Sequence, residues 1–115
     1  MATIPVTVTE KPAQSFLASW PNLASGDVGA EIDYVGHADR TVQVFGNFGG
    51  ATVTLEGSLD RTNWATLNDA QGNPIQITAA RIEAITELVL WVRPSAAGGT
   101  GTDVTVNLLM RKTMG

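Results

Sequence analysis

The sequence predicts an all-β protein of one domain, folded as an antiparallel sandwich or barrel. Its 115 residues are the length of a single domain. Apolar and polar residues alternate with a period of two in most of its apolar runs, which is typical of half-buried strands. Clusters of glycine, proline, asparagine and aspartate separate these runs every 10 to 12 residues or so, the spacing expected between short antiparallel strands.

The expected strands follow one another along the whole chain. Alternating runs occupy residues 4–9, 28–34, 41–44, 52–56, 75–78 and 104–111. The run ELVLWVRP (87–94) is apolar on both faces and predicts a central strand, covered on each side, that ends at Pro94. For residues 78–85 a short helical turn is an open alternative, because Ile82 and Ile85 are three positions apart.

The first 20 residues differ from the rest, because prolines at positions 5, 12 and 21 surround short apolar pieces. We therefore expect residues 1–20 to form an N-terminal arm or edge strand and residues 21–115 to form the sandwich domain. An arm of this kind is suited to lie on another subunit. Its apolar side chains are candidates for contact with a partner: Ile4, Val6, Val8, Phe16 and Trp20.

Composition and motifs predict neither an enzyme nor a metal or cofactor site. The chain has no cysteine, and its single histidine, His37, lies in no recognisable catalytic motif. Its loop aspartates lack calcium-binding spacing and are expected to bond their own backbone. The glycine-rich pieces 45–50 and 96–101 lack the lysine and helix of a phosphate-binding loop, so we expect hairpin turns there.

The charge and hydropathy patterns exclude two classes of partner. The net charge is −4, and no stretch is basic enough to follow a phosphate backbone, so nucleic acid is not expected to bind. No apolar run approaches the roughly 20 residues of a membrane span. The N-terminus lacks the basic start and apolar core of a signal peptide, which favours synthesis in a cytoplasm.

The segment EGSLDRTNWATL (56–67) can be interpreted in two ways. In the structural interpretation, Asp60 accepts backbone N–H groups in a tight loop and Trp64 packs over the end of the fold. In the functional interpretation, Arg61 and Trp64 form a stacking surface for a sugar or a protein partner. Trp91, which lies within the apolar run, is expected to be a core residue, and Trp20 is expected to be the tryptophan that contacts a partner.

Three stretches together resemble small virion proteins of tailed bacteriophages. They are TVQVFGNFGG (41–50), VTLEGSLDRTNWATLNDAQGNPI (53–75) and LWVRPSAAGGTGTDVTVNLLMRKT (90–113). The shared pattern is a strand, a G-S-x-D-x-x-x-W turn, L-x-D-x-x-G-N-P, then W-V-R-P, a glycine-rich loop and a final alternating strand. The resemblance covers about residues 41 to 113 and implies a compact β-sandwich, jelly-roll-like fold. It supplies no catalytic residue.

The resemblance also implies a function. Related proteins look like capsid decoration, or cement, proteins, so the expected partner is the major capsid protein and the expected location is the capsid surface of the virion. Such a protein would bind across capsomer boundaries as a homo-oligomer, with dimer and trimer both open. A phage tail or fibre component, with Arg61 and Trp64 helping to bind a glycan, is the alternative. A carbohydrate-binding module is a third interpretation.

Overall fold

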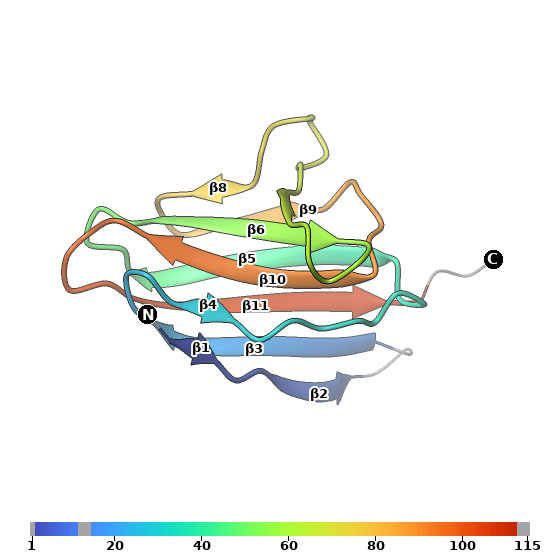
Figure 1. Ribbon diagram of the computed structural model, residues 1–115. Helices are drawn as coiled ribbons and strands as arrows, with labels where there is room; N and C mark the ends of the chain where they lie inside the picture. Colours follow the sequence, from blue (N-terminus) through green and yellow to red (C-terminus); the bar gives the residue numbers. More distant parts are fainter. Residues whose placement is uncertain (1, 12–14, 113–115) are drawn as a thin grey trace.

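The computed structural model describes residues 2–11 and 15–112, which form eleven β-strands and no helix. The strands build two sheets that pack face to face, with the N-terminus at one side and the last strand, β11, running through the middle of the second sheet (Figure 1). The predicted all-β sandwich of one domain is therefore confirmed.

Sheet A has six strands. Its strand order is β1-β4-β10-β6-β7, and β8 pairs with β6 at residues 53–54, whereas β7 pairs with it at residues 56–57. Only the β1–β4 pair is parallel. The strands of sheet A are β1 (Thr3–Ile4), β4 (Val28–Gly29), β6 (Thr52–Ser58), β7 (Ala65–Thr66), β8 (Gln76–Ile77) and β10 (Trp91–Ala97).

Sheet B is antiparallel throughout and contains the longest strands. Its order is β2-β3-β11-β5-β9, so β11 is the central strand. The strands of sheet B are β2 (Thr7–Lys11), β3 (Ser15–Leu23), β5 (Asp39–Asn47), β9 (Arg81–Ala84) and β11 (Asp103–Arg111).

The connections between the two sheets follow the jelly-roll pattern. Eight of the strands form two facing groups of four, β3-β11-β5-β9 in sheet B and β4-β10-β6-β8 in sheet A. Successive strands from β3 to β6 alternate between the sheets, and the first strand of the set, β3, pairs with the last, β11. This arrangement of two interleaved Greek keys is the jelly roll that the resemblance implies.

The core lies between the sheets and is built by strict alternation along the strands. In β11, for example, Val104, Val106, Leu108 and Met110 are fully buried while the residues between them are exposed or half-buried. Successive side chains of a strand point to opposite faces, so a period-two sequence buries one face only. The predicted alternation therefore identified the core face correctly in β6 and β11.

The N-terminal segment is divided between the two sheets. Strand β1 forms the edge of sheet A, β2 forms the edge of sheet B, and β3 lies inside sheet B between β2 and β11. The expectation of an edge strand thus describes β1 and β2. The expected boundary at residue 20, however, cuts through β3, whose Ala18, Trp20 and Leu23 are completely buried in the common core. Residues 12–14 lie outside the described residues.

Two further segments are clarified by the structure. Residues 81–84, where a short helical turn was left open, form the edge strand β9, because they pair with β5. Strand β10 does not end at Pro94 but continues to Ala97. On the β4 side of β10, Val92 and Ile32 exchange two backbone hydrogen bonds, and the Ala96 N–H donates to the Asp27 carbonyl. Pro94 lies between these two positions, where no partner needs a hydrogen bond from it, so its missing N–H is tolerated.

Candidate functional site

The loop between β6 and β7 is closed by its own polar side chains. Asp60 Oδ1 accepts the backbone N–H groups of Thr62 and Asn63 at 2.9 and 2.8 Å, as the sequence predicts for this aspartate. Ser58 Oγ accepts the N–H groups of Asp60 and Arg61, and its hydroxyl donates to Asp60 Oδ1. The bonds from the backbone and side chain of Asn63 hold the pKa of the Asp60 carboxyl well below its usual range. The loop is therefore a preformed anionic turn.

The loop and strand β10 together place two arginines over two tryptophans on the outer face of sheet A: Arg61 and Trp64 come from the loop, and Trp91 and Arg93 from β10. The Arg61 guanidinium lies 4.6 Å from the ring centroid of Trp91, and the Arg93 guanidinium lies 4.0 Å from that of Trp64. Each arginine also binds a carboxylate: Arg61 Nε donates to Glu31 at 2.6 Å, and Arg93 Nε to Glu56 at 2.9 Å. The face thus carries two carboxylate–arginine–tryptophan stacks.

These stacks change the functional interpretation of the tryptophans. Trp91 is half-buried on the outer face, so the expectation that it belongs to the core is wrong. Arg61 and Trp64 do not stack on each other but are members of different stacks. A sugar platform needs a free indole face, whereas in each stack one face of the ring is covered by a guanidinium that is itself held by a carboxylate.

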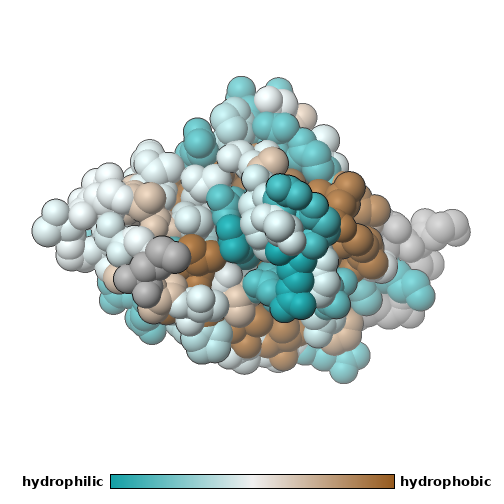
Figure 2. Space-filling view, viewed as in Figure 1, coloured by the Kyte–Doolittle hydropathy of each residue, from teal (hydrophilic) through white to brown (hydrophobic). Residues whose placement is uncertain are grey.

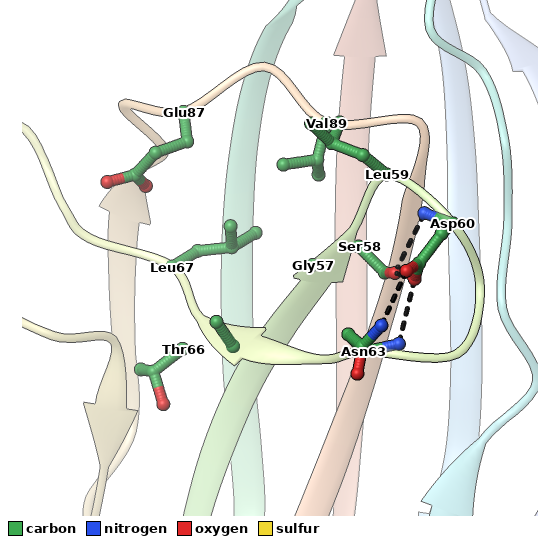
Figure 3. A pocket seen from close by; sticks show the side chains of 10 residues that line it. Gly57, Ser58, Leu59, Asp60, Asn63, Thr66, Leu67, Glu87 and Val89 are labelled. Carbon is green, nitrogen blue, oxygen red and sulfur yellow. Dashed lines mark hydrogen bonds between the residues drawn. The ribbon is translucent and has the colours of Figure 1, made fainter.

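A cavity of about 360 Å³ lies beside the loop, between β7 and the segment that leads into β10 (Figure 3). Its floor is apolar and is formed by Gly57, Ala65, Leu67 and Val89. A Cβ at Gly57 would lie 2.7 Å from both Leu67 and Val89 side-chain carbons, so a side chain there would displace both residues. The absence of a side chain at this position therefore lets Leu67 and Val89 pack closely beside the cavity.

The polar groups at the rim of this cavity are engaged within the protein. Glu87 accepts the backbone N–H of Asn68 at 2.7 Å and its side-chain amide at 2.6 Å, and the backbone bond in particular lowers the pKa of Glu87. Asp60 Oδ2 accepts the side-chain amide of Asn63. Because the carboxylates are held in place and remain ionised, the cavity offers an apolar floor with a fixed negative rim.

Exposed leucines line the cavity or flank one of its lining residues in the chain. Leu59, which lines it, is 66% exposed, and Leu88 and Leu90, on either side of the lining residue Val89, are 52% and 41% exposed. Figure 2 shows apolar surface over the segment leading into β10, next to the hydrophilic loop. We call Leu59, Leu88, Leu90 and the cavity the corner surface. Sequence reasoning missed the last two leucines, because an unbroken apolar run predicts a buried strand.

The N-terminal contact candidates lie mostly against the core. Ile4, Val6, Val8 and Phe16 are half-buried and pack on the core cluster. Trp20 is completely buried and its indole N–H donates to the carbonyl of Ala30 at 2.8 Å. The expectation that Trp20 contacts a partner is therefore wrong, because its ring fills the interior and its polar atom is satisfied there.

The His37 side chain packs against two aromatic rings. Its ring lies 5.0 Å from that of Phe16 and 6.0 Å from that of Tyr34, both in edge-to-face geometry. Within residues 2–11 and 15–112, no group of three or more His, Asp or Glu side chains is placed to hold a metal ion. The same part of the chain includes no helix with the length and apolar character needed to cross a membrane.

The comparisons with known proteins concern the fold. No protein-family model matches the sequence, and no curated protein is significantly similar to it. Among solved structures, the SPBc2 prophage-derived protein YomS superposes with a TM-score of 0.65 at 13% identity, over 89% of this chain and 98% of YomS. Protein NMB1881 from Neisseria meningitidis gives a TM-score of 0.45 at 8% identity, over 94% and 82% of the two chains. The chain thus shares its overall fold with a protein of prophage origin.

Proposed function

We propose that this chain is a structural protein of a tailed-bacteriophage virion, and that it decorates the outer shell of the capsid by binding the major capsid protein. It works by contact alone, as a cement protein that favours the assembled shell because it binds that state. The observation that carries the proposal is the shared jelly-roll fold with a prophage-derived protein, which extends over nearly the whole of both chains.

The corner surface supports this proposal as the site of shell contact. The exposed Leu59 lines a preformed cavity with an apolar floor, and the exposed Leu88 and Leu90 flank its lining residue Val89 in the chain. An apolar side chain of the shell fits such a cavity. The fixed carboxylates Asp60 and Glu87 at the rim favour a shell segment in which that side chain lies next to lysine or arginine. This surface includes part of the segment 56–67, for which contact with a partner is one of the two interpretations of the sequence.

The N-terminal edge is a weaker site for this contact. The side chains of Ile4, Val6 and Val8 are directed to the core, so a partner would reach mainly the backbone of β2 and its exposed threonines. Deleting residues 1–12 would remove β1 and β2 together and uncover the core. Loss of binding in such a truncation would therefore report lost stability as much as lost contact.

The alternative of a glycan-binding tail or fibre component receives less support. It requires Trp64 to offer its ring to a sugar, while Arg93 lies 4.0 Å from the centroid of that ring and is held by Glu56. A tail component that binds proteins through the same corner surface remains a distinct outcome of the experiment below.

Co-sedimentation with expanded, empty capsids tests the proposal. The purified full chain is expected to bind with saturation at a fixed ratio to the major capsid protein. Leu59→Glu and Leu88→Glu should each weaken binding at least tenfold, because a charge next to the cavity must be desolvated on contact and repels its carboxylate rim.

Val35→Glu is the matched control, since it adds the same charge at an apolar residue that is 39% exposed and does not line the cavity. Equal loss of binding in all three variants would remove the corner surface from the proposal. No binding by the wild-type chain, with binding to purified tails instead, would replace the capsid role by a tail role.

A further inference from the structure

The outer face of sheet B has the composition of a protein interface. Its exposed apolar side chains are Ile82, Phe45 and Leu109, at 60%, 41% and 41%, with the half-buried Leu17 among them. Between the strand ends the other residues of this face are threonine, serine, asparagine, glutamine and alanine, so no charge interrupts it. Depletion of charge around apolar anchors distinguishes the centre of an interface from ordinary surface.

We propose that this face is the contact surface of a two-fold symmetric dimer, in which a second copy of the chain packs its own sheet B face to face against the first. The proposal is independent of the capsid role, because it concerns the protein in solution and a surface on the opposite side of the sandwich from sheet A.

The charges at the two ends of the face favour a second copy as the occupant. Asp103 lies at one end of β11. Arg111 lies at the other end, ion-paired with Asp39 of the neighbouring strand, and Lys11 lies at the same end two strands away, so that end keeps a net positive charge. If two faces pack with their strands antiparallel, Asp103 of each copy comes opposite Arg111 of the other. An isologous contact needs this self-complementarity, whereas an unrelated partner does not.

The centre of the face is hollowed where the two-fold axis would pass. A shallow cavity of about 240 Å³ is lined by Leu17, Thr41, Gln43, Ile82, Asn107 and Leu109. Asn107 is the middle residue of the middle strand, and it lies level with Gln43, which in turn pairs with Ile82. In the antiparallel arrangement these residues face their own copies, so Ile82 meets Ile82 of the second copy and the hollow accommodates side chains from the facing sheet.

The size of the face is sufficient for a specific dimer. Five strands span roughly 24 Å across, and the nine-residue strands extend for about 30 Å, while the edge strands β2 and β9 are shorter. The flat face is thus on the order of 600 Å² per copy, or about 1,200 Å² in total, which is the lower end of the range for stable protein interfaces. A dimer of moderate affinity is therefore expected.

Analytical ultracentrifugation of the full chain, without capsids, is the direct test. The wild type is expected to sediment as a monomer–dimer equilibrium whose dimer mass is twice the 12.1 kDa of the chain. Ile82→Glu and, separately, Leu109→Glu should raise the dimer dissociation constant at least tenfold. The first substitution brings two carboxylates face to face across the axis, and the second buries an unpaired carboxylate in the contact. Leu59→Glu is the control, since it adds the same charge on the corner surface and should leave the equilibrium unchanged.

Ile82 is the more decisive position, because it lies on the edge strand β9 and its side chain is largely in solvent, so its replacement is not expected to disturb folding. Circular dichroism and the melting temperature verify the fold of each variant. A wild-type chain that stays monomeric up to about 100 μM, well above the micromolar range of a moderate interface, would overturn the proposal. So would a trimer, or a dimer that both sheet-B variants leave intact.

Cross-linking adds a positive test, because the chain has no cysteine of its own. A single Asn107→Cys variant should be joined to its own copy by a bis-maleimide reagent of about 10 Å span, the distance between stacked sheets. A Thr62→Cys variant, on the loop over sheet A, should not be joined. Equal cross-linking of the two variants would count against the sheet-B contact.

Discussion

The guanidinium of Arg93 lies 4.0 Å from the centre of the Trp64 ring, and the same arginine donates to Glu56 on the neighbouring strand. Arg93 and Glu56 are directly paired across β10 and β6, while Trp64 stands just before β7. One side chain therefore connects three consecutive strands of sheet A on their outer face. A second stack, Glu31–Arg61–Trp91, ties the loop to the same face.

Arg93→Ala is expected to destabilise the protein by about 1 kcal/mol, since a partly exposed cation–π contact contributes roughly 0.5–1 kcal/mol and a half-exposed ion pair adds a few tenths. The melting temperature should fall by about 5 °C in calorimetry for a domain of this size. Lys112→Ala removes the same charge from an exposed position outside the stacks and should change the melting temperature little. Equal effects of the two substitutions would mean that net charge, and not stacking, is responsible.

Gly29 is a position where the sandwich has no room for a side chain. A Cβ there would lie 2.6 Å from both a ring carbon of Pro94 and Cδ1 of Trp20. Gly29→Ala should therefore cost about 1–3 kcal/mol through overpacking, because two rigid rings have to move. Gly36→Ala is the matched control, since nothing lies within 4 Å of its added Cβ. Urea unfolding of the two variants measures the difference, and a Gly29→Ala protein as stable as Gly36→Ala would contradict the packing described here.

The parts of the fold that could be predicted from the sequence are the strands that bury one face against the core and leave the other face nearer to solvent. Strands β6 and β11 alternate between buried and exposed residues, and that pattern appears directly in the order of residues. Strand β9 was missed because it is an edge strand with three exposed residues out of four. Its burial therefore leaves almost no alternation of apolar and polar residues in the sequence. The prediction that the strand ends at Pro94 is wrong because it considers one strand alone. The gap in the hydrogen bonds opposite Pro94 is made by the neighbouring segment of the sheet.

The candidate site was less predictable, for a related reason. The Asp60 turn is a local structure, and its backbone bonds follow from residues 58–63 alone. Which arginine stacks on which tryptophan depends on how β10 lies beside β6 and the loop, so adjacency in sequence does not reveal that Arg61 and Trp64 belong to different stacks. The cavity and the exposed leucines beside it arise where the chain leaves the sheet before Trp91, which an apolar run does not reveal.

Trp20→Phe distinguishes a core residue from a contact residue. The substitution removes the indole N–H that binds the Ala30 carbonyl and leaves space in the closed core, so a loss of about 2–3 kcal/mol in the free energy of unfolding is expected. Trp64→Phe, at a half-buried surface position, should cost less than about 1 kcal/mol. Capsid binding by the folded fraction of Trp20→Phe should equal that of the wild type. A stable Trp20→Phe protein with weakened binding would restore Trp20 as a contact residue.

The loop carboxylate Asp60 should make stability depend on acid pH. Its pKa in the folded protein lies well below the ordinary value of 3.8, chiefly because the Asn63 backbone N–H binds the ionised form. The folded pKa is depressed, so the stabilisation is present above the unfolded pKa and is lost as the pH falls through the folded one. The lowered pKa values of Glu31, through Arg61, and Glu87, through Asn68, act in the same direction.

Unfolding of wild type and Asp60→Asn should therefore be compared from about pH 6 to about pH 2, where the carboxylates become protonated. At the upper end of this pH range Asp60→Asn is expected to be less stable than the wild type. The free energies of unfolding of the two proteins should converge as the pH falls. Asn63→Ala keeps the carboxylate but removes the amide that donates to Asp60 Oδ2, so its acid transition should begin at a higher pH than that of the wild type. A difference between wild type and Asp60→Asn that stays constant over the whole range would show that the shape of the side chain, and not its charge, holds the loop closed.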